Sequence, residues 1–266
     1  MTAPILVTGG TGTLGRRIVP LLRDAGCDLR ILSRHDRKSG DGVEYATGDL
    51  VKNEGVEAAV TGAETVIHLA GGPKGDEIAA RNLVAAASRA SVSHLVFISV
   101  VNADRIPIGY YRQKIASEKI IADSGVPYTI LRAAQFHELV AKVGSVLARL
   151  PLVPIPGRIR LQSVDSRDVA ERMVELALGA PAGLVRDLVG PQVIGAGELI
   201  RGYLSAAGKR RLTMPMPLPG TIGRLYRDGA NLALDGADVG HRTWTDFIDE
   251  QVRTTTADGG IKAAYR

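Results

Sequence analysis

A glycine-rich turn between the first apolar run and the first helical pattern constrains this chain more than any other feature. The segment VTGGTGTLGR, residues 7–16, has glycines at positions 9, 10, 12 and 15. It fits both Gly-x-Gly-x-x-Gly, from Gly10, and Gly-x-x-Gly-x-x-Gly, from Gly9. Such glycines permit a tight strand-to-helix turn and let backbone N–H groups approach a pyrophosphate. The turn therefore predicts a nucleotide site, with a merely glycine-rich turn as the alternative.

The first half of the chain alternates short β-branched runs with helical stretches. Six such runs precede residue 137, at 4–9, 28–33, 43–47, 64–70, 93–100 and 127–133. Strands separated by helical patterns form parallel sheets that helices cover on both faces. The pattern predicts an α/β fold with a doubly wound parallel sheet of the Rossmann type.

The regular alternation of strand and helix patterns ends after residue 136. This change predicts a core over 1–136 and a small C-terminal α/β substrate region over 137–266, packed together as one globular unit. Three prolines and a glycine in 149–159 are expected to interrupt any regular element, and 214–220 is expected to be a proline-stiffened loop. Asp165 or Ser166 is expected to cap a helix over 167–178. A strand over 184–190, a helix over 197–208 and a weakly held tail over 254–266 complete the expectations.

Charge and cysteine content narrow the class of protein. The net charge is +5 and the pI near 9.4, but Lys209–Arg211 is the only tight basic cluster and aromatic residues make up 4%. This favours a solvated basic face over a nucleic-acid site, which needs aromatic stacking platforms. A single cysteine, Cys27, and five scattered histidines imply neither a disulfide nor a metal. Without a leader or an apolar run of about 18 residues, the chain is expected to be cytoplasmic and not bound to membranes.

The end of the second predicted strand bears on which dinucleotide binds. An NAD site usually has an acid there, about 20 residues after the glycine loop, for the ribose 2′-hydroxyl. This chain has Ser33 and Arg34 instead. A guanidinium suits a 2′-phosphate, and Arg16 at the start of the helix is a second cation. The sequence therefore favours NADP(H), while NAD(H) with Asp36 in the acidic role is the alternative.

Six motifs in order resemble a known family. With the glycine loop they are ATGDL (46–50), IHLAG (67–71), FISVV (97–101), YYRQK (110–114) and GVPYTILRAAQF (125–136). Over roughly residues 3–200 the chain resembles the short-chain dehydrogenase/reductase superfamily, and within it the atypical, NmrA-like NAD(P)-binding members.

The resemblance implies roles for residues around the cofactor. Asp49 and Leu50 would flank the adenine, and Leu69, Ala70 and Gly71 would form a backbone wall beside the ribose and pyrophosphate. Asn82 would have a structural role on its helix. The cofactor-binding set comprises Gly9, Gly12, Thr13, Leu14, Gly15, Ser33, Arg34, Asp49, Leu50, Leu69, Ala70, Gly71 and Lys114.

Tyr110 and Lys114 lie four residues apart on a predicted helix, so their side chains share one face. An ammonium beside a phenol lowers the phenol pKa from about 10 towards the range useful for proton transfer. In enzymes of the family that this chain resembles, the tyrosine protonates the substrate oxygen, the lysine holds the nicotinamide ribose and a serine positions the substrate. Ser99 matches that serine. The alternatives are chance spacing, competition from Tyr111, and a strand-end hydroxyl that caps local backbone.

Three residues after the sixth predicted strand, Gln135, Phe136 and His137, are expected to line the substrate pocket by the same resemblance. His137 is either an alternative acid or base, because an imidazole titrates near neutrality, or a packed or capping residue.

These features predict an NADP(H)-dependent oxidoreductase that transfers hydride to a carbonyl, a quinone or an activated double bond of a small molecule. Two alternatives remain: a non-catalytic NADP(H)-sensing regulator, and an isomerase, dehydratase or cyclase that uses the cofactor transiently or not at all. Signatures of α/β-hydrolases, phosphate-loop kinases and zinc proteases do not occur in the sequence. A monomer or homodimer is expected.

Overall fold

The chain folds into two compact units, seen in a computed structural model that describes residues 3–40, 42–72 and 74–257. The first unit comprises Met1–Arg132 and Val169–Arg186, and the second comprises Ala133–Asp168 and Asp187–Arg266. Each unit therefore combines two separate stretches of sequence, and the chain passes between the units after residues 132, 168 and 186.

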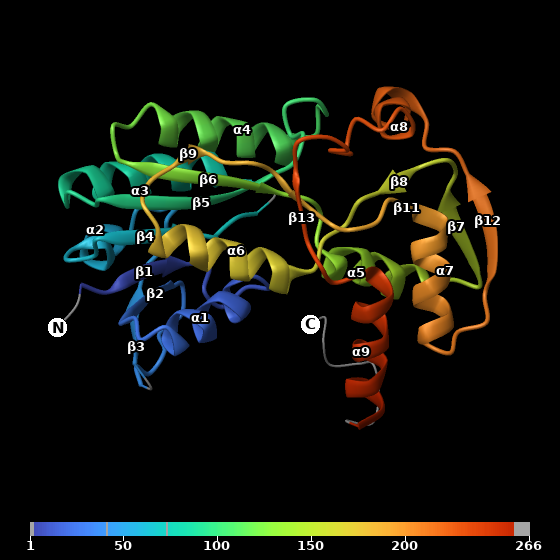
Figure 1. The fold of residues 1–266 in the computed structure, drawn as a ribbon, viewed down its shortest axis with the longest axis horizontal. Helices are drawn as coiled ribbons and strands as arrows, with labels where there is room; N and C mark the ends of the chain where they lie inside the picture. The colour runs from blue at the N-terminus through green and yellow to red at the C-terminus, as the bar shows by residue number, and fades with distance from the viewer. Residues whose placement is uncertain (1–2, 41, 73, 258–266) are drawn as a thin grey trace. The chain divides into compact units, whose positions relative to one another are not determined.

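The first unit is built on a parallel sheet with the strand order β6-β5-β4-β1-β2-β3, flanked by helices (Figure 1). Its strands are β1 (Ile5–Thr8), β2 (Leu29–Ser33), β3 (Val43–Thr47), β4 (Thr65–His68), β5 (His94–Val100) and β6 (Tyr128–Ala133), and β9 (Gly183–Leu184) pairs with β6. The helices that connect these strands are α1 (Gly15–Asp24), α2 (Val56–Val60), α3 (Asp76–Arg89) and α4 (Gly109–Ala122). All six predicted strands form, and the doubly wound α/β fold is confirmed.

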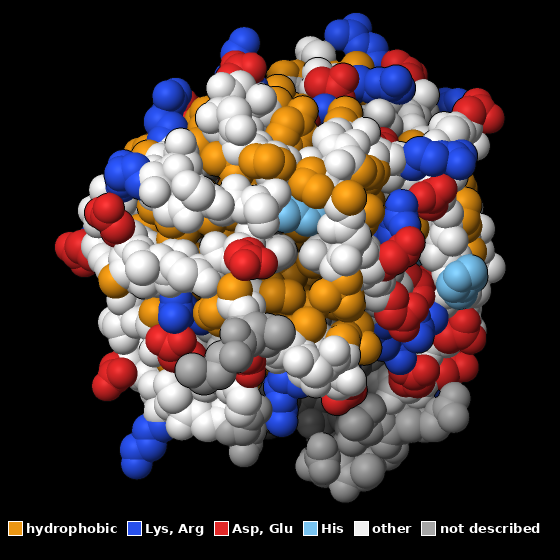
Figure 2. Space-filling view, turned by 60° about the vertical axis from the view of Figure 1, so that its left-hand side comes forward, with side chains coloured by type: hydrophobic (Ala, Val, Ile, Leu, Met, Phe, Trp, Pro, Cys, Tyr) orange, Lys and Arg blue, Asp and Glu red, His pale blue; other side chains and the backbone are white. Residues whose placement is uncertain are grey.

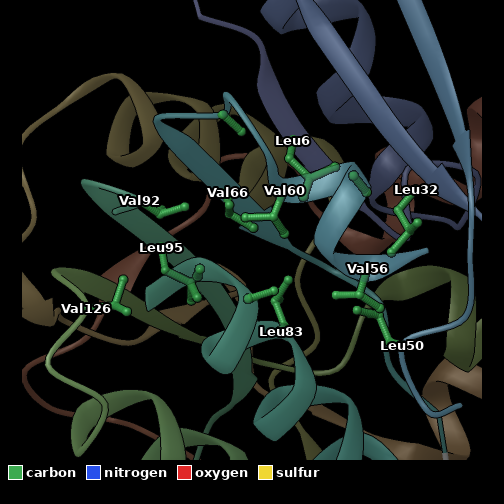
Figure 3. Packing of buried hydrophobic residues seen from close by; sticks show 14 of the residues in the cluster. Leu6, Leu32, Leu50, Val56, Val60, Val66, Leu83, Val92, Leu95 and Val126 are labelled. Atoms are coloured by element: carbon green, nitrogen blue, oxygen red, sulfur yellow. The ribbon is translucent and has the colours of Figure 1, made fainter. Parts of the chain in front are cut away.

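Continuous apolar runs form these strands because helices cover the sheet and leave little of it exposed. Every residue of β1 and of β5 is buried. Figure 3 shows Val56 and Val60 of α2 and Leu83 of α3 packed beside Leu6 of β1 and Val66 of β4. This core fixes the ends of β1, β4 and β5 relative to one another.

The second unit contains shorter elements. They are α5 (His137–Leu147), β7 (Leu152–Pro156), β8 (Arg160–Leu161), β10 (Leu188–Val189), β11 (Ile194–Gly195), α7 (Ala196–Ala206), β12 (Leu212–Met216), α8 (Gly220–Arg227), β13 (Asp238–Val239) and α9 (Trp244–Ala257). Side chains of α5, α7 and α9 share one apolar cluster, which includes Tyr203, Trp244 and Phe247. The expected helix over 197–208 is α7.

Two proline-rich segments correct the sequence-based expectation. Residues 152–156 and 212–216 are not irregular but form the parallel pair β7 and β12, in which Pro154 lies opposite Met214 and Pro215 opposite Ile155. A two-stranded sheet leaves one edge of each strand unpaired, so a proline fits wherever the ladder needs no N–H. The proline-rich composition was therefore a poor guide to these two segments.

Other expectations hold in part. The helix α6 (Ser166–Leu178) is capped by Asp165, whose Oδ1 accepts the Arg167 N–H at 2.8 Å. The strand expected over 184–190 is divided into β9 and β10. Of the expected tail over 254–266, residues 254–257 belong to α9 and the others lie outside the described residues.

One face of the molecule shows how charged side chains are distributed. In Figure 2, basic and acidic side chains are interspersed, with no unbroken basic patch on the described part of this face. Within the described ranges, no helix has both the length and the hydrophobicity that crossing a bilayer requires.

Candidate functional site

The candidate site lies at the carboxyl edge of the first unit's sheet. Strand order reverses between β1 and β4, and ligands of open α/β sheets bind outside the carboxyl ends of the strands at such a point. Thr8 and His68 are the last residues of β1 and β4, and Ser99 is the next-to-last residue of β5. The glycine loop follows Thr8 directly.

The glycines of the loop are required by close backbone packing. Gly9 has a φ of +74°, and a Cβ there would lie 2.6 Å from the backbone N of Ala70. A Cβ on Gly15 would collide with the carbonyl oxygen of Gly9. The loop therefore lies directly against the end of β4, where Leu69 and Ala70 are half-buried. This is the close helix–strand packing that a pyrophosphate-binding turn requires.

The start of α1 suits an anion. Its first turn contains no acidic residue and, among the described residues, no side chain caps it. Arg16 follows and donates from Nε to the carbonyl oxygen of Thr11 at 2.9 Å, while Thr13 is exposed and Leu14 is buried. Free N–H groups and the helix dipole favour negative charge here. The loop thus fits the pyrophosphate of a dinucleotide.

The loop after β2 carries more positive charge than Arg34 alone. Ser33 is held locally, since its Oγ donates to the carbonyl oxygen of His35 at 2.8 Å. Arg34 is exposed, and so are Arg37 and Lys38, two cations outside the predicted site. The Arg37 guanidinium lies 6.0 Å from the ring centroid of Tyr45. The excess of arginine and lysine in this segment was the available signal.

The residues that the resemblance places beside the adenine form a locally bonded turn after β3. Asp49 Oδ1 accepts the backbone N–H groups of Val51 and Lys52 at 2.8 and 3.1 Å. Asn82 of α3 donates from Nδ2 to the carbonyl oxygen of Leu50 at 2.7 Å. Asn82 therefore has the structural role that the resemblance implied, because it ties α3 to this turn.

Lys114 occupies a buried position next to the wall formed by the end of β4. Its Nζ forms an ion pair with Asp76 Oδ2 at 3.2 Å and donates to the Ile98 carbonyl oxygen at 3.4 Å. A Cβ on Gly71 would lie 2.9 Å from this Nζ. The glycine loop therefore lies against Ala70, and the next residue, Gly71, lies against Lys114. Asp76 was missed, although its place at the start of the helix after IHLAG was a usable signal.

Tyr110 shares a helix face with Lys114 as predicted, with its ring centroid 5.8 Å from Nζ. The expected lowering of its pKa is wrong. Burial, the charge of Asp76 and the neighbouring Tyr111 raise the pKa of Tyr110 to about 12. Burial lowers the pKa of Lys114, and the charge of Asp76 opposes that shift. Because Asp76 balances the ammonium, the phenolate of Tyr110 gains little stabilisation.

Ser99 is buried in β5, and its Oγ has no hydrogen-bond partner among the residues that the structure describes. It therefore does not cap local backbone there, which was the alternative to a substrate-positioning role. A buried hydroxyl without a partner is uncommon and marks a place where a ligand group can supply the bond. Positioning of a substrate by Ser99 stays a prediction.

A buried pair at the ends of β1 and β4 was also missed. The Oγ1 of Thr8 and the Nδ1 of His68 lie 2.7 Å apart, and the His68 ring stacks on Phe97 at a centroid distance of 5.3 Å. Burial, with the charge of Lys114, lowers the pKa of His68 to about 3. His68 is therefore neutral at physiological pH.

The three expected pocket residues lie in the second unit. The carbonyl oxygen of Gln135 accepts the Val164 N–H, and half-buried Phe136 precedes α5. His137 is buried, with Nδ1 3.0 Å from Ser163 Oγ and its ring against Trp244. Burial lowers its pKa. The structure therefore favours a packing role for the His137 side chain over a role as acid or base.

Comparison with known families and proteins agrees with this geometry. Residues 9–178 match the family described as NAD(P)H-binding. A (4-alkanoyl-5-oxo-2,5-dihydrofuran-3-yl)methyl phosphate reductase of Streptomyces griseus is 31% identical over 73% of this chain and 70% of its own. The photosystem II assembly factor Ycf39 of Trieres chinensis is 30% identical over 63% of this chain and 57% of its own.

Among solved structures, the NADPH complex of an Escherichia coli quinone oxidoreductase has a similar fold. Its TM-score is 0.78, with 20% identity over 92% of this chain and 99% of that one. At this identity the likeness shows the fold.

Proposed function

This chain belongs to the NAD(P)H-binding family, and we propose that it is an NADP(H)-dependent reductase that delivers hydride to a small organic acceptor. The acceptor class is a carbonyl, a quinone or an activated double bond. Support comes from the similar reductase of Streptomyces griseus and the similarly folded quinone oxidoreductase. The relatives include a reductase and an assembly factor, and the experiment below identifies the acceptor.

One observation carries the proposal. The glycine loop lies against Ala70, and Gly71 lies against the Lys114 ammonium, one helical turn from Tyr110. A dinucleotide whose pyrophosphate lies on this loop would therefore extend toward the two side chains that its chemistry requires. The cations Arg34, Arg37 and Lys38 after β2 support a 2′-phosphate, and hence NADP(H), at the other end.

Each side chain has a proposed task. The reduced nicotinamide, when bound, supplies the hydride. Lys114 holds the nicotinamide ribose through its ammonium. Tyr110 keeps its proton up to high pH, so its hydroxyl donates a hydrogen bond to the acceptor oxygen and passes on the proton as negative charge develops there. Ser99 Oγ positions the same oxygen.

The test follows hydride directly. Protein is mixed with NADPH deuterated at C4 and a panel of quinones, azo dyes, unsaturated lactones and aldehydes. We expect loss of absorbance at 340 nm with transfer of deuterium to the product, and a lower affinity for NADH than for NADPH. In Tyr110→Phe, kcat should fall by at least about 100-fold, because positioned proton donors contribute on the order of 100- to 10,000-fold.

Tyr128→Phe is the matched control, since Tyr128 is half-buried at the start of β6 and has no proposed role in the reaction. It should keep the kcat of the unmodified chain. Tight binding of NADPH without deuterium transfer to any acceptor would contradict the reductase.

The similarity to an assembly factor favours a second candidate, a non-catalytic NADP(H)-binding regulator. For a regulator, Tyr110→Phe should leave the regulatory function intact. A partner protein should bind with different affinities in the presence of NADP⁺ and of NADPH.

A further inference from the structure

Lys114 is a buried charge with one close acidic partner. Only 3% of its side chain is exposed, and 6% of the Asp76 side chain. Moving an ammonium from water into a buried site is unfavourable unless a counter-charge and hydrogen bonds compensate for the lost hydration. The Nζ–Oδ2 ion pair at 3.2 Å supplies the counter-charge. The aromatic ring of Phe97, whose centroid lies 4.9 Å from Nζ, adds a weaker attraction.

The other oxygen of Asp76 is also engaged. Its Oδ1 accepts the backbone N–H of Gly72 at 2.7 Å. A Cβ on Gly71 would lie 2.9 Å from Lys114 Nζ and 3.2 Å from Asp76 Oδ2. The carboxylate therefore bridges the lysine and the loop that follows β4, which is the predicted wall of the ribose and pyrophosphate site.

The remaining titratable groups near Lys114 do not replace Asp76. Glu118, on the same helix, is paired with Arg132, which donates to both carboxylate oxygens of Glu118 at 2.9 and 2.7 Å. His68 on β4 is neutral, and Tyr110 keeps its proton. Asp76 is therefore the acid that balances the ammonium directly.

We propose that Asp76 is a positioning residue that keeps Lys114 charged and holds its ammonium against Gly71, where the cofactor is expected to bind. The inference depends on the function proposed above in one respect, namely that Lys114 contacts the bound cofactor. The ion pair between Asp76 and Lys114 is present in the cofactor-free protein, so its effect on the protonation of Lys114 can be measured without NADPH.

The first experiment uses cofactor-free protein. Urea unfolding of the unmodified chain and of Asp76→Asn is followed from pH 6.5 to 9.5. Without the carboxylate, the folded-state pKa of Lys114 falls further below its unfolded value, so the unfolded state binds more protons and stability rises with pH. We expect Asp76→Asn to be least stable at pH 6.5 and to approach the unmodified chain at pH 9.5. Parallel curves at every pH would overturn the proposal.

The second experiment measures NADPH affinity by fluorescence from pH 7 to 9. In Asp76→Asn the dissociation constant should rise at least fivefold over this range as Lys114 loses its proton, and it should stay level in the unmodified chain. Lys114→Met should weaken binding by the same factor at every pH, and the double variant should match it. A uniform loss in Asp76→Asn, or no loss, would reduce Asp76 to a structural residue and overturn the proposal.

Glu77→Gln is the matched control. It removes the neighbouring acid from the same helical turn, and that acid pairs with Arg81 at the surface. It should change neither pH profile. If the unmodified chain fails to bind NADPH, the proposed function fails, while the unfolding profiles still decide whether Asp76 controls Lys114.

Discussion

At the scale of single residues, burial decides which groups near the candidate site carry charge. Lys114 is balanced by Asp76, whereas His68 has a hydroxyl partner, Thr8, and stays neutral. A positive imidazole beside the ammonium would add repulsion in a region of low dielectric. The neutral state of His68 therefore contributes to keeping Lys114 in place.

The low pKa of His68 makes stability depend on pH. Folded His68 has a pKa of about 3, against 6.5 when unfolded, so acid protonates the unfolded state first. Stability should therefore fall as the pH drops from 6.5 towards 3, by up to about 1.4 kcal/mol per pH unit from this residue. In His68→Gln, which keeps an acceptor for Thr8, the free energy of unfolding measured in urea should depend less steeply on pH by that amount.

His35→Gln provides the control, since His35 is exposed in the loop after β2. It should follow the unmodified chain. Equal slopes for His68→Gln and the unmodified chain would contradict the buried neutral imidazole. Burial also lowers the pKa values of His94 and His137, so some acid sensitivity should persist in every variant.

At the scale of elements, the glycine loop and α1 form a unit whose spacing is set by backbone contacts. The glycines leave no room for a Cβ between the loop, the start of α1 and the end of β4. The sequence predicted this unit because the glycine spacing is a local property. By contrast, the sequence did not predict β7 and β12, because both contain prolines. Whether a strand tolerates a proline depends on which of its edges is paired, and that is decided by tertiary structure.

Gly15→Ala tests the loop. The added Cβ would press on the carbonyl of Gly9 and on the backbone of Gly10, so we expect a loss of about 1–3 kcal/mol of unfolding free energy and weaker NADPH binding. Urea unfolding and NADPH fluorescence measure the two effects.

Gly157→Ala is the control, because a Cβ there meets nothing within 4 Å. Its stability should stay within about 0.5 kcal/mol of the unmodified chain. Full NADPH affinity in Gly15→Ala would contradict the assignment of the loop to the pyrophosphate.

At the scale of the whole molecule, each unit is assembled from two stretches of chain. The first unit needs residues 169–186 as well as 1–132. Val169, Ala170 and Met173 are completely buried, and β9 pairs with β6. The apolar contacts that define a unit therefore join segments far apart in sequence.

A chain that ends at Arg132 should not fold cooperatively, because it lacks α6 and β9 and exposes the apolar surface that these cover. A chain that ends at Arg186 should keep NADPH binding. Circular dichroism during urea unfolding, with NADPH fluorescence, distinguishes the two. A sharp unfolding transition and NADPH binding in the shorter chain would contradict the discontinuous unit.

The sequence by itself determined the parallel sheet, the glycine loop and the pairing of Tyr110 with Lys114 on one helix face, because strand period, glycine spacing and helical spacing are local. Only the tertiary structure decided the electrostatics of the site. Asp76 meets Lys114 from another helix, and Thr8 meets His68 from another strand. The protonation of a buried group depends on such neighbours and on its distance from water, and neither is encoded in the spacing of residues along the chain.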